Sequence, residues 1–118
     1  MADEVIDREA LERLMDVIGG DPEDLQELLD EFEATAPRTV TAMRAAAAAG
    51  DLDALRIGAH TLKGNARDFG ATALSGVCST LEAECRTGAV SDPQAQVERI
   101  AQELDRARAA LSGLAVRE

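Results

Sequence analysis

The sequence predicts an all-α protein: an antiparallel up-down four-helix bundle with an additional short N-terminal helix packed across one end. Apolar residues recur three and four positions apart in every segment, which places them along one side of a helix, and no stretch alternates with a period of two. Aromatic residues make up only 2% of the chain. The core must therefore be aliphatic and rich in alanine, which suits close helix packing. The 118 residues are expected to form one domain, residues 1–118, with a core from about residue 7 to residue 114.

The first helix is expected to be short. Residues 1–6 are predicted to be a frayed lead, and Asp7 is a suitable N-cap for the helix that follows. Gly19-Gly20 ends this helix. Its apolar side consists of Ala10, Leu11, Leu14, Met15 and Ile18.

The second helix is expected to be long. Asp21-Pro22 begins it, because an aspartate side chain caps a helix and proline fits the first helical position. The apolar pattern continues through Pro37 without losing phase, which predicts one helix kinked at Pro37 and ended by Gly50. A proline inside a helix costs about 3 kcal/mol or more, so a break near Thr35–Ala36 is the alternative.

Three further helices follow. Asp51 caps the third, which carries the only histidine of the chain and ends at Gly70. The fourth comes after a tight turn and ends near Gly88, and Asp92-Pro93 begins the last one. The apolar stripes of these last two helices consist of Leu74, Val77, Cys78, Leu81 and Cys85, and then Val97, Ile100, Leu104, Ala107, Leu111 and Leu114. Since each helix has one apolar side and the connections are short, neighbouring helices should pack antiparallel.

Charge and cysteine content limit the possible partners and location. The net charge of −11 disfavours nucleic acid and anionic membranes as partners. Cys78 and Cys85 are seven residues apart on one predicted helix, about 10 Å between Cα atoms, too far for a disulfide. Both lie on the apolar stripe and are expected to be buried free thiols. With no signal peptide and no membrane-spanning run, a cytoplasmic location is expected.

The stretch from Gly58 to Gly70 contains the residues that are able to take part in a chemical reaction. His60 is the only histidine and Lys63 the only lysine. His60 comes one residue after the apolar stripe, which places it at the edge of the buried face. Lys63 and Gly64 follow three and four residues later and share its exposed side. Arg56, Lys63 and Arg67 form a small positive island there. The simpler interpretation is an ordinary solvated face with a boundary histidine.

Most catalytic constellations are excluded by what the sequence lacks. One histidine and two core cysteines cannot build an ordinary zinc site, and there is no Glu-x-x-His pair or phosphate-binding glycine loop. Gly64 is informative because a glycine inside a helix costs about 1 kcal/mol relative to alanine. The stripe points Gly64 away from the core, so clearance for an approaching molecule explains it better than close helix packing does.

These residues resemble a known family. His60-Thr61-Leu62-Lys63-Gly64, followed by Phe69-Gly70 and Leu81-Glu82, resembles the histidine phosphotransfer (HPt) domain of bacterial two-component phosphorelays. The resemblance extends from about Asp21 to Gly88. Phe32, Pro37 and Gly50-Asp51 also occur where that family tends to have them.

The resemblance implies a function. His60 would accept a phosphoryl group on Nε2 from a phospho-aspartate of a response-regulator receiver domain or a hybrid sensor histidine kinase, and could pass it on. Lys63 would stabilise that group, Gly64 would admit the partner, and Glu82 would hydrogen-bond Nδ1. No cofactor or metal is expected on this chain, because Mg²⁺ would come with the receiver, and no autonomous catalysis is expected. The expected partner-binding residues are Arg56, Ala59, Lys63, Gly64, Arg67 and Asp68.

Arg67 departs from the family pattern, because members often carry a small residue at that position. We expect Arg67 to help select the receiver. The alternative functions are a helical adaptor that is never phosphorylated, the phosphoacceptor domain of a chemotaxis-type histidine kinase, and an enzyme that uses His60 as a general acid–base. The initial methionine and clean ends favour a free-standing protein, although a domain of a hybrid kinase would look the same, and a monomer is expected.

Overall fold

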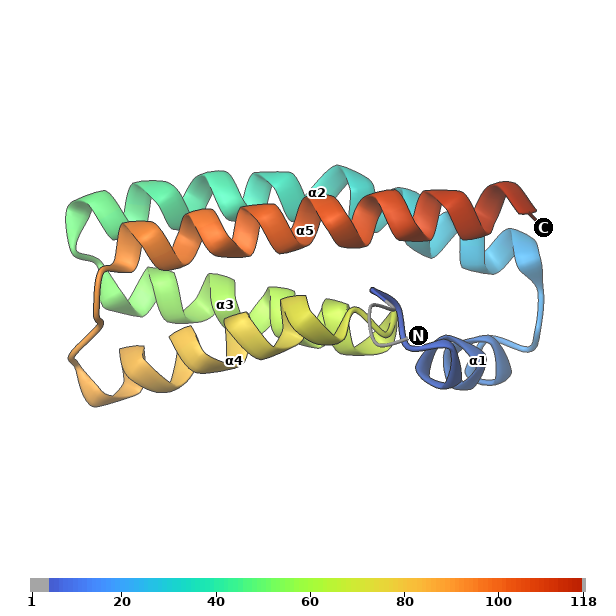
Figure 1. Cartoon of the computed structure of the whole chain (residues 1–118), viewed down its shortest axis with the longest axis horizontal. Coiled ribbons are helices and arrows are strands. Elements are labelled where there is room, and N and C mark those ends of the chain that lie inside the picture. The colour runs from blue at the N-terminus through green and yellow to red at the C-terminus, as the bar shows by residue number, and fades with distance from the viewer. Residues whose placement is uncertain (1–4, 118) are drawn as a thin grey trace.

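The computed structural model describes the backbone of residues 5–117 and the side chains of residues 5–113. It contains the helices α1 (Arg8–Val17), α2 (Pro22–Ala49), α3 (Leu52–Asp68), α4 (Thr72–Thr87) and α5 (Pro93–Arg117), drawn in Figure 1. Within the described part of the chain there is no strand, only an isolated β-bridge. The all-α prediction is therefore confirmed.

The four longer helices lie side by side along the long axis of the molecule (Figure 1). Both α2 and α4 contact α3 and α5, so the contacts form a closed ring around a shared interior. The colour gradient shows that successive helices in this group run in opposite directions. The short α1 contacts α3 and lies beyond the end at which α3 finishes. This arrangement leaves the outer side of each helix free for polar and functional residues.

Local capping explains where the helices begin and end. The side chains of Asp7, Asp21 and Asp51 each accept a hydrogen bond from a backbone N–H in the first turn of the helix that follows, as predicted. Gly50 and Gly88 adopt left-handed conformations, with φ of 70° and 80°, at the ends of α2 and α4. Residues with a Cβ rarely adopt these angles, which is why glycine ends both helices.

Pro37 lies inside α2, which continues from Pro22 to Ala49. The prediction of one long helix is confirmed, and the alternative break near Thr35–Ala36 is wrong. The apolar residues on both sides of Pro37 explain this result, because Phe32, Ala36 and Val40 are all buried. Their burial outweighs the local cost of a proline in a helix.

The N-terminal lead differs from the prediction. Ile6 is buried and forms an antiparallel bridge with Ala71, and the Asp7 N–H donates to the Gly70 carbonyl at 2.7 Å. The prediction of a frayed lead is therefore wrong for Ile6, whereas residues 1–4 lie outside the described part of the chain. Val5 and Ile6, the two apolar residues before the Asp7 cap, are too few to show a helical or strand period. The contact that orders Ile6 comes from the α3–α4 turn.

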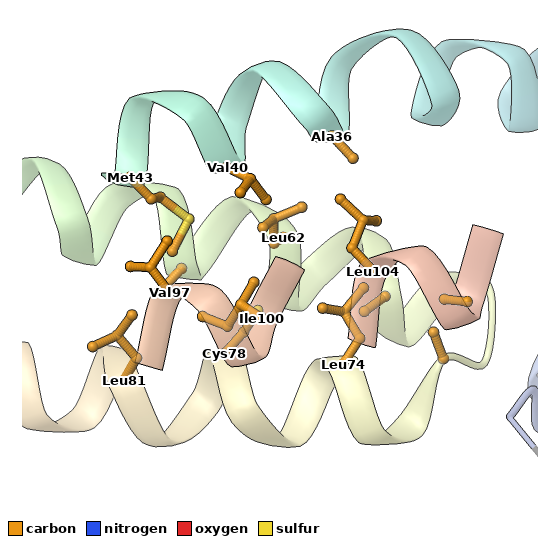
Figure 2. Close-up of a cluster of buried hydrophobic side chains, with 14 of the residues drawn as sticks. Ala36, Val40, Met43, Leu62, Leu74, Cys78, Leu81, Val97, Ile100 and Leu104 are labelled. Carbon is orange, nitrogen blue, oxygen red and sulfur yellow. The ribbon is translucent and has the colours of Figure 1, made fainter. Parts of the chain in front are cut away.

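The apolar stripes meet between the four long helices (Figure 2). Val40 and Met43 from α2 face Leu62 from α3, Cys78 and Leu81 from α4, and Val97 and Ile100 from α5. Both cysteines are buried and free, as predicted, whereas the side chain of Leu114 lies outside the described residues. No helix within residues 5–117 is long and apolar enough to cross a membrane.

Candidate functional site

His60 lies on the exposed shoulder of α3. Its side chain is 62% exposed, whereas its neighbours Ala59 and Leu62 are completely buried. The 100° step between residues of a helix produces this contrast, because Ala59 and Leu62 face the bundle interior while His60 does not. The imidazole is therefore attached to a rigid helix but remains open to an approaching molecule.

The Nδ1 atom of His60 is held by Glu82 of α4. The carboxylate oxygen Oε2 lies 2.8 Å from Nδ1, and the Glu82 side chain is only 5% exposed. An ionised carboxylate can only accept a hydrogen bond, so Nδ1 carries the proton and donates it. In a neutral ring the lone pair is then on Nε2, the nitrogen at the far side of the ring.

Glu82 stays ionised because cations occupy both of its oxygens. Lys63 Nζ donates to Oε1 at 2.5 Å, and a terminal nitrogen of Arg86 donates to Oε2 at 3.0 Å. The hydrogen bond from Lys63 is the main reason that the pKa of Glu82 is lowered to about 2; burial acts in the opposite direction, and the hydrogen bond from His60 adds to the lowering. A buried carboxylate without such partners would be strongly disfavoured.

Arg86 is a site residue that the sequence reasoning missed. It lies four residues after Glu82 on α4, and this spacing brings oppositely charged side chains together on a helix. That spacing was the signal that could have identified it. When the imidazole is neutral, the two cations Lys63 and Arg86 and the single anion Glu82 give the site one net positive charge. A site with this balance favours a negatively charged group near the ring.

Gly64 leaves open space one turn after His60. A Cβ built on Gly64 would meet nothing within 4 Å, and the residue is exposed. Close helix packing therefore does not explain this glycine, whereas it does explain Gly58, where a Cβ would come within 2.5 Å of the Met43 side chain. The absent side chain at Gly64 leaves the surface of α3 open one turn after the imidazole.

The other expected partner-binding residues are not all at the surface. Arg67 and Asp68 are exposed, and Arg56 is half-buried and pairs with Asp53 at 2.9 Å. Ala59 is completely buried, so its place in the expected partner surface is a mistake that the structure corrects. It belongs to the apolar stripe of α3. The sequence reasoning also overlooked Ile57, a large apolar residue on α3 that is 52% exposed.

No group of three or more histidine, cysteine, aspartate or glutamate side chains within the described residues is placed to hold a metal ion. The single imidazole and the cation-capped carboxylate are thus the chemical groups that this face offers. Glu82 cannot readily take up a proton near neutral pH, because its pKa is about 2. The arrangement suits a nucleophilic nitrogen, with a proton fixed on the other ring nitrogen.

Comparison with known proteins agrees with this geometry. The model of the Hpt domain matches residues 27–110. The crystal structure of histidine-containing phosphotransfer protein B (HptB) from Pseudomonas aeruginosa PAO1 is similar to this chain, with a TM-score of 0.87 and 29% sequence identity over 98% of both chains. No curated protein sequence matches. The match to the domain model covers most of the chain, and the chain therefore belongs to the Hpt domain family and functions in histidine phosphotransfer within phosphorelays.

Proposed function

We propose that His60 is the residue that carries the phosphoryl group. Histidine phosphotransfer requires a histidine, and His60 is the only one in the chain. The observation that supports the proposal most strongly is the pairing of its Nδ1 with the buried Glu82 carboxylate at 2.8 Å. This pairing selects the tautomer in which Nε2 is the nucleophile and keeps the ring in place.

The proposed reaction starts from an aspartyl phosphate on a receiver domain. The Nε2 lone pair attacks phosphorus, a P–N bond forms, the P–O bond to the aspartyl carboxyl breaks, and the carboxylate leaves with the bonding electrons. The Nδ1 proton stays in place, so the ring gains a positive charge, which the Glu82 carboxylate offsets. The reverse reaction passes the phosphoryl group to another receiver.

The cations around Glu82 have a defined part in this proposal. Lys63 and Arg86 keep Glu82 ionised, and their combined charge compensates both that carboxylate and part of the incoming phosphoryl charge. Phosphoryl transfer depends mainly on positioning and electrostatic stabilisation rather than on covalent help from the protein. The chain would supply the nucleophile and the docking surface, whereas the receiver would supply the aspartate and Mg²⁺.

The setting of this reaction follows from the same features. We infer that an antiparallel up-down four-helix bundle, with α1 packed across one end, is the scaffold that holds α3 and α4 in register. The chain would act as a monomer, without a cofactor and without catalytic activity of its own. The two free cysteines fit a reducing compartment, so we expect the chain to act in the cytoplasm.

We further propose that Arg67 helps to select the receiver. Its side chain is exposed one turn after Lys63, where it can pair with an acidic residue of a partner. Replacing it in Arg67→Ala should change the ratio of transfer rates between cognate and non-cognate receivers. A ratio of transfer rates that is the same before and after the replacement would show that Arg67 does not select the receiver.

The experiment that tests the proposed function is transfer of labelled phosphate. The chain is mixed with receiver domains that carry a labelled aspartyl phosphate, and we expect label on the chain that is labile in acid and stable in base. His60→Gln should remain folded by circular dichroism and acquire no label. Binding of phosphorylated receivers without label would instead support the adaptor function, and label acquired directly from a kinase and ATP would support the chemotaxis-type alternative.

A further inference from the structure

The short helix α1 is weakly attached to the rest of the molecule. None of its ten residues is buried, and within residues 5–117 its one substantial backbone contact with another helix is with α3. It lies beyond the end of α3 rather than alongside the four long helices (Figure 1). Among the described side chains, no ion pair joins α1 to another helix.

The side chains beneath α1 leave space between the helices. A groove of about 360 Å³ lies there, and its apolar lining consists of Leu14 of α1, Leu28 and Phe32 of α2, and Phe69 at the end of α3. Leu11 and Leu14 are only partly buried against the core. Because apolar contacts are strong only where atoms pack closely, an interface with this much open space holds α1 less firmly than a filled one would.

The two ends of α1 are held in different ways. Before the helix, Ile6 is 5% exposed and forms a bridge with Ala71. After the helix, Gly19 and Gly20 have φ angles of 86° and 76°, and a Cβ on either glycine would meet nothing within 4 Å. Ile6 is therefore a packed anchor, whereas the glycine pair is unpacked backbone that can rotate with little steric hindrance.

Charge opposes the docking of α1. Residues 5–34 contain eleven aspartates and glutamates and only two arginines, whereas residues 35–118 contain ten acidic and ten basic residues. The negative charge is therefore concentrated in α1 and the first half of α2, which the glycine pair holds close together. Like charges repel, and at about 10 mM salt this repulsion extends over about 30 Å.

We propose that α1 is a strap that opens independently of the four long helices. It swings about the glycine pair when Ile6 leaves its bridge, and the open form uncovers Phe32 and Phe69, whose ring centroids are 5.1 Å apart. Charge repulsion favours the open form, so the balance between the two forms responds to ionic strength. The inference goes beyond the proposed function and does not depend on it, because no step involves His60.

The test is hydrogen exchange of the ¹⁵N-labelled chain, followed at single amides. Amides in the middle of α1 should exchange at least about a hundredfold faster than those of Leu62 and Leu81, because they require only the local opening. Ile6→Ala should raise the α1 rate about tenfold to a hundredfold, since about three buried methylene-sized groups are lost. Leu14→Ala should also raise it, because it removes contact across the groove.

Two further variants are the controls. Val17→Ala alters an 82% exposed side chain of the same helix, and the α1 rate should stay within about twofold of that in the unaltered chain. Val97→Ala removes a completely buried side chain of α5, and it should raise the exchange rates of Leu62 and Leu81 but not that of α1. Acceleration of α1 and the core by the same factor in Val97→Ala would overturn the inference, because α1 would then open only with the whole bundle.

A salt series tests the part played by charge. Raising sodium chloride from about 10 mM to about 0.5 M reduces the range of repulsion from about 30 Å to below about 10 Å, so exchange in α1 should slow by about threefold or more. Each rate is divided by that of a peptide of residues 5–20 at the same salt, which corrects for the effect of salt on the exchange reaction. A ratio that does not fall with salt would overturn the claim that charge favours the open form.

Discussion

At the scale of single residues, Glu82 is unusual because its charged side chain is buried. It is the only buried polar or charged residue among the side chains of residues 5–113, and its hydrogen-bond partners His60, Lys63 and Arg86 all donate to it. No buried side-chain nitrogen or oxygen atom in this part of the chain lacks a partner. Glu82 thus links α3 and α4 and hydrogen-bonds the imidazole, so we expect both the stability of the fold and phosphotransfer to depend on this carboxylate.

We predict that Glu82→Gln lowers the free energy of unfolding at pH 7 by about 1–3 kcal/mol, because charge-assisted hydrogen bonds from Lys63 and Arg86 are weakened. The pKa of Glu82 is lowered from 4.5 to about 2 in the folded chain. Its contribution is therefore complete above the unfolded value and is lost as pH falls through the folded one. The difference between the two proteins should shrink between these two pH values.

Urea unfolding of both proteins at a series of pH values measures this difference. Glu84→Gln is a useful control, because the pKa of Glu84 is also lowered, but by hydrogen bonds from the Ser91 backbone and the Gln96 side chain, which lie away from His60. Glu84→Gln should change stability without changing phosphotransfer. A stability difference for Glu82→Gln that stays constant from neutral pH into this acid range would contradict the proposed ionisation.

At the scale of single helices, the glycines have different physical roles. Gly64 in α3 and Gly76 in α4 are both exposed inside a helix, and a Cβ on either would meet nothing within 4 Å. Neither is needed for packing within this chain. Only Gly64 lies beside His60. Substitutions at Gly64 and Gly76 can therefore distinguish the effect of a new side chain on helix stability from its effect on an approaching partner.

We predict that Gly64→Gln and Gly76→Gln both leave the fold intact and raise the free energy of unfolding by up to about 1 kcal/mol, because glycine is a poor helix former. Gly64→Gln should slow transfer from a receiver at least tenfold by obstructing its approach, whereas Gly76→Gln should transfer at the normal rate. Thermal unfolding and transfer kinetics measure the two effects. Equal rates for the two variants would show that Gly64 does not provide clearance.

Gly70 connects α3 to the N-terminal segment. Its φ is +77°, and a Cβ there would come within 2.4 Å of the Asp7 carbonyl oxygen. Gly88 has a similar φ of +80° but open space around it. Both positions therefore disfavour a side chain through the backbone angle, and only Gly70 does so through contact as well.

We predict that Gly88→Ala costs about 1 kcal/mol through backbone strain, and that Gly70→Ala costs about 1–3 kcal/mol more, because Asp7 must move. Denaturant unfolding gives both values. Hydrogen exchange of the Asp7 amide, which bonds to Gly70, should also become faster in Gly70→Ala only. Equal losses of stability in the two variants would show that the close approach to Asp7 carries no energetic weight.

At the scale of the whole molecule, the two cysteines report on the integrity of the bundle. Cys78 and Cys85 are both buried on α4, and burial is the main cause that raises the pKa of both thiols, that of Cys78 to about 12. Reaction with an alkylating reagent requires the thiolate and access to it. Both conditions are missing while the four long helices are packed together.

We predict that iodoacetamide modifies Cys78 only when the bundle opens, and that Cys85, which is 8% exposed, reacts earlier. Mass spectrometry of alkylated peptides, with and without denaturant, measures the order and the rates. Destabilised variants such as Gly70→Ala should shorten the time needed to modify Cys78, because opening is more frequent. Rapid modification of Cys78 in the native, unaltered chain would contradict the packing in Figure 2.

The sequence by itself determined the helices, their starts and the phosphoacceptor candidate. These features depend on residues close together in the chain: aspartate caps, apolar residues three and four apart, and the segment from His60 to Gly64. Such local signals do not depend on which helix packs where. The long helix through Pro37 was predictable for the same reason, because the phase of the apolar pattern survives the proline.

Only the tertiary structure decided the contacts between distant segments. It placed Ile6 against the α3–α4 turn and brought Lys63 of α3 to the Glu82 carboxylate of α4. Spacing predicts which side of its own helix a residue occupies, but the neighbour on that side is set by how the helices pack. The charge balance around His60 is therefore a property of the assembled bundle rather than of any one helix.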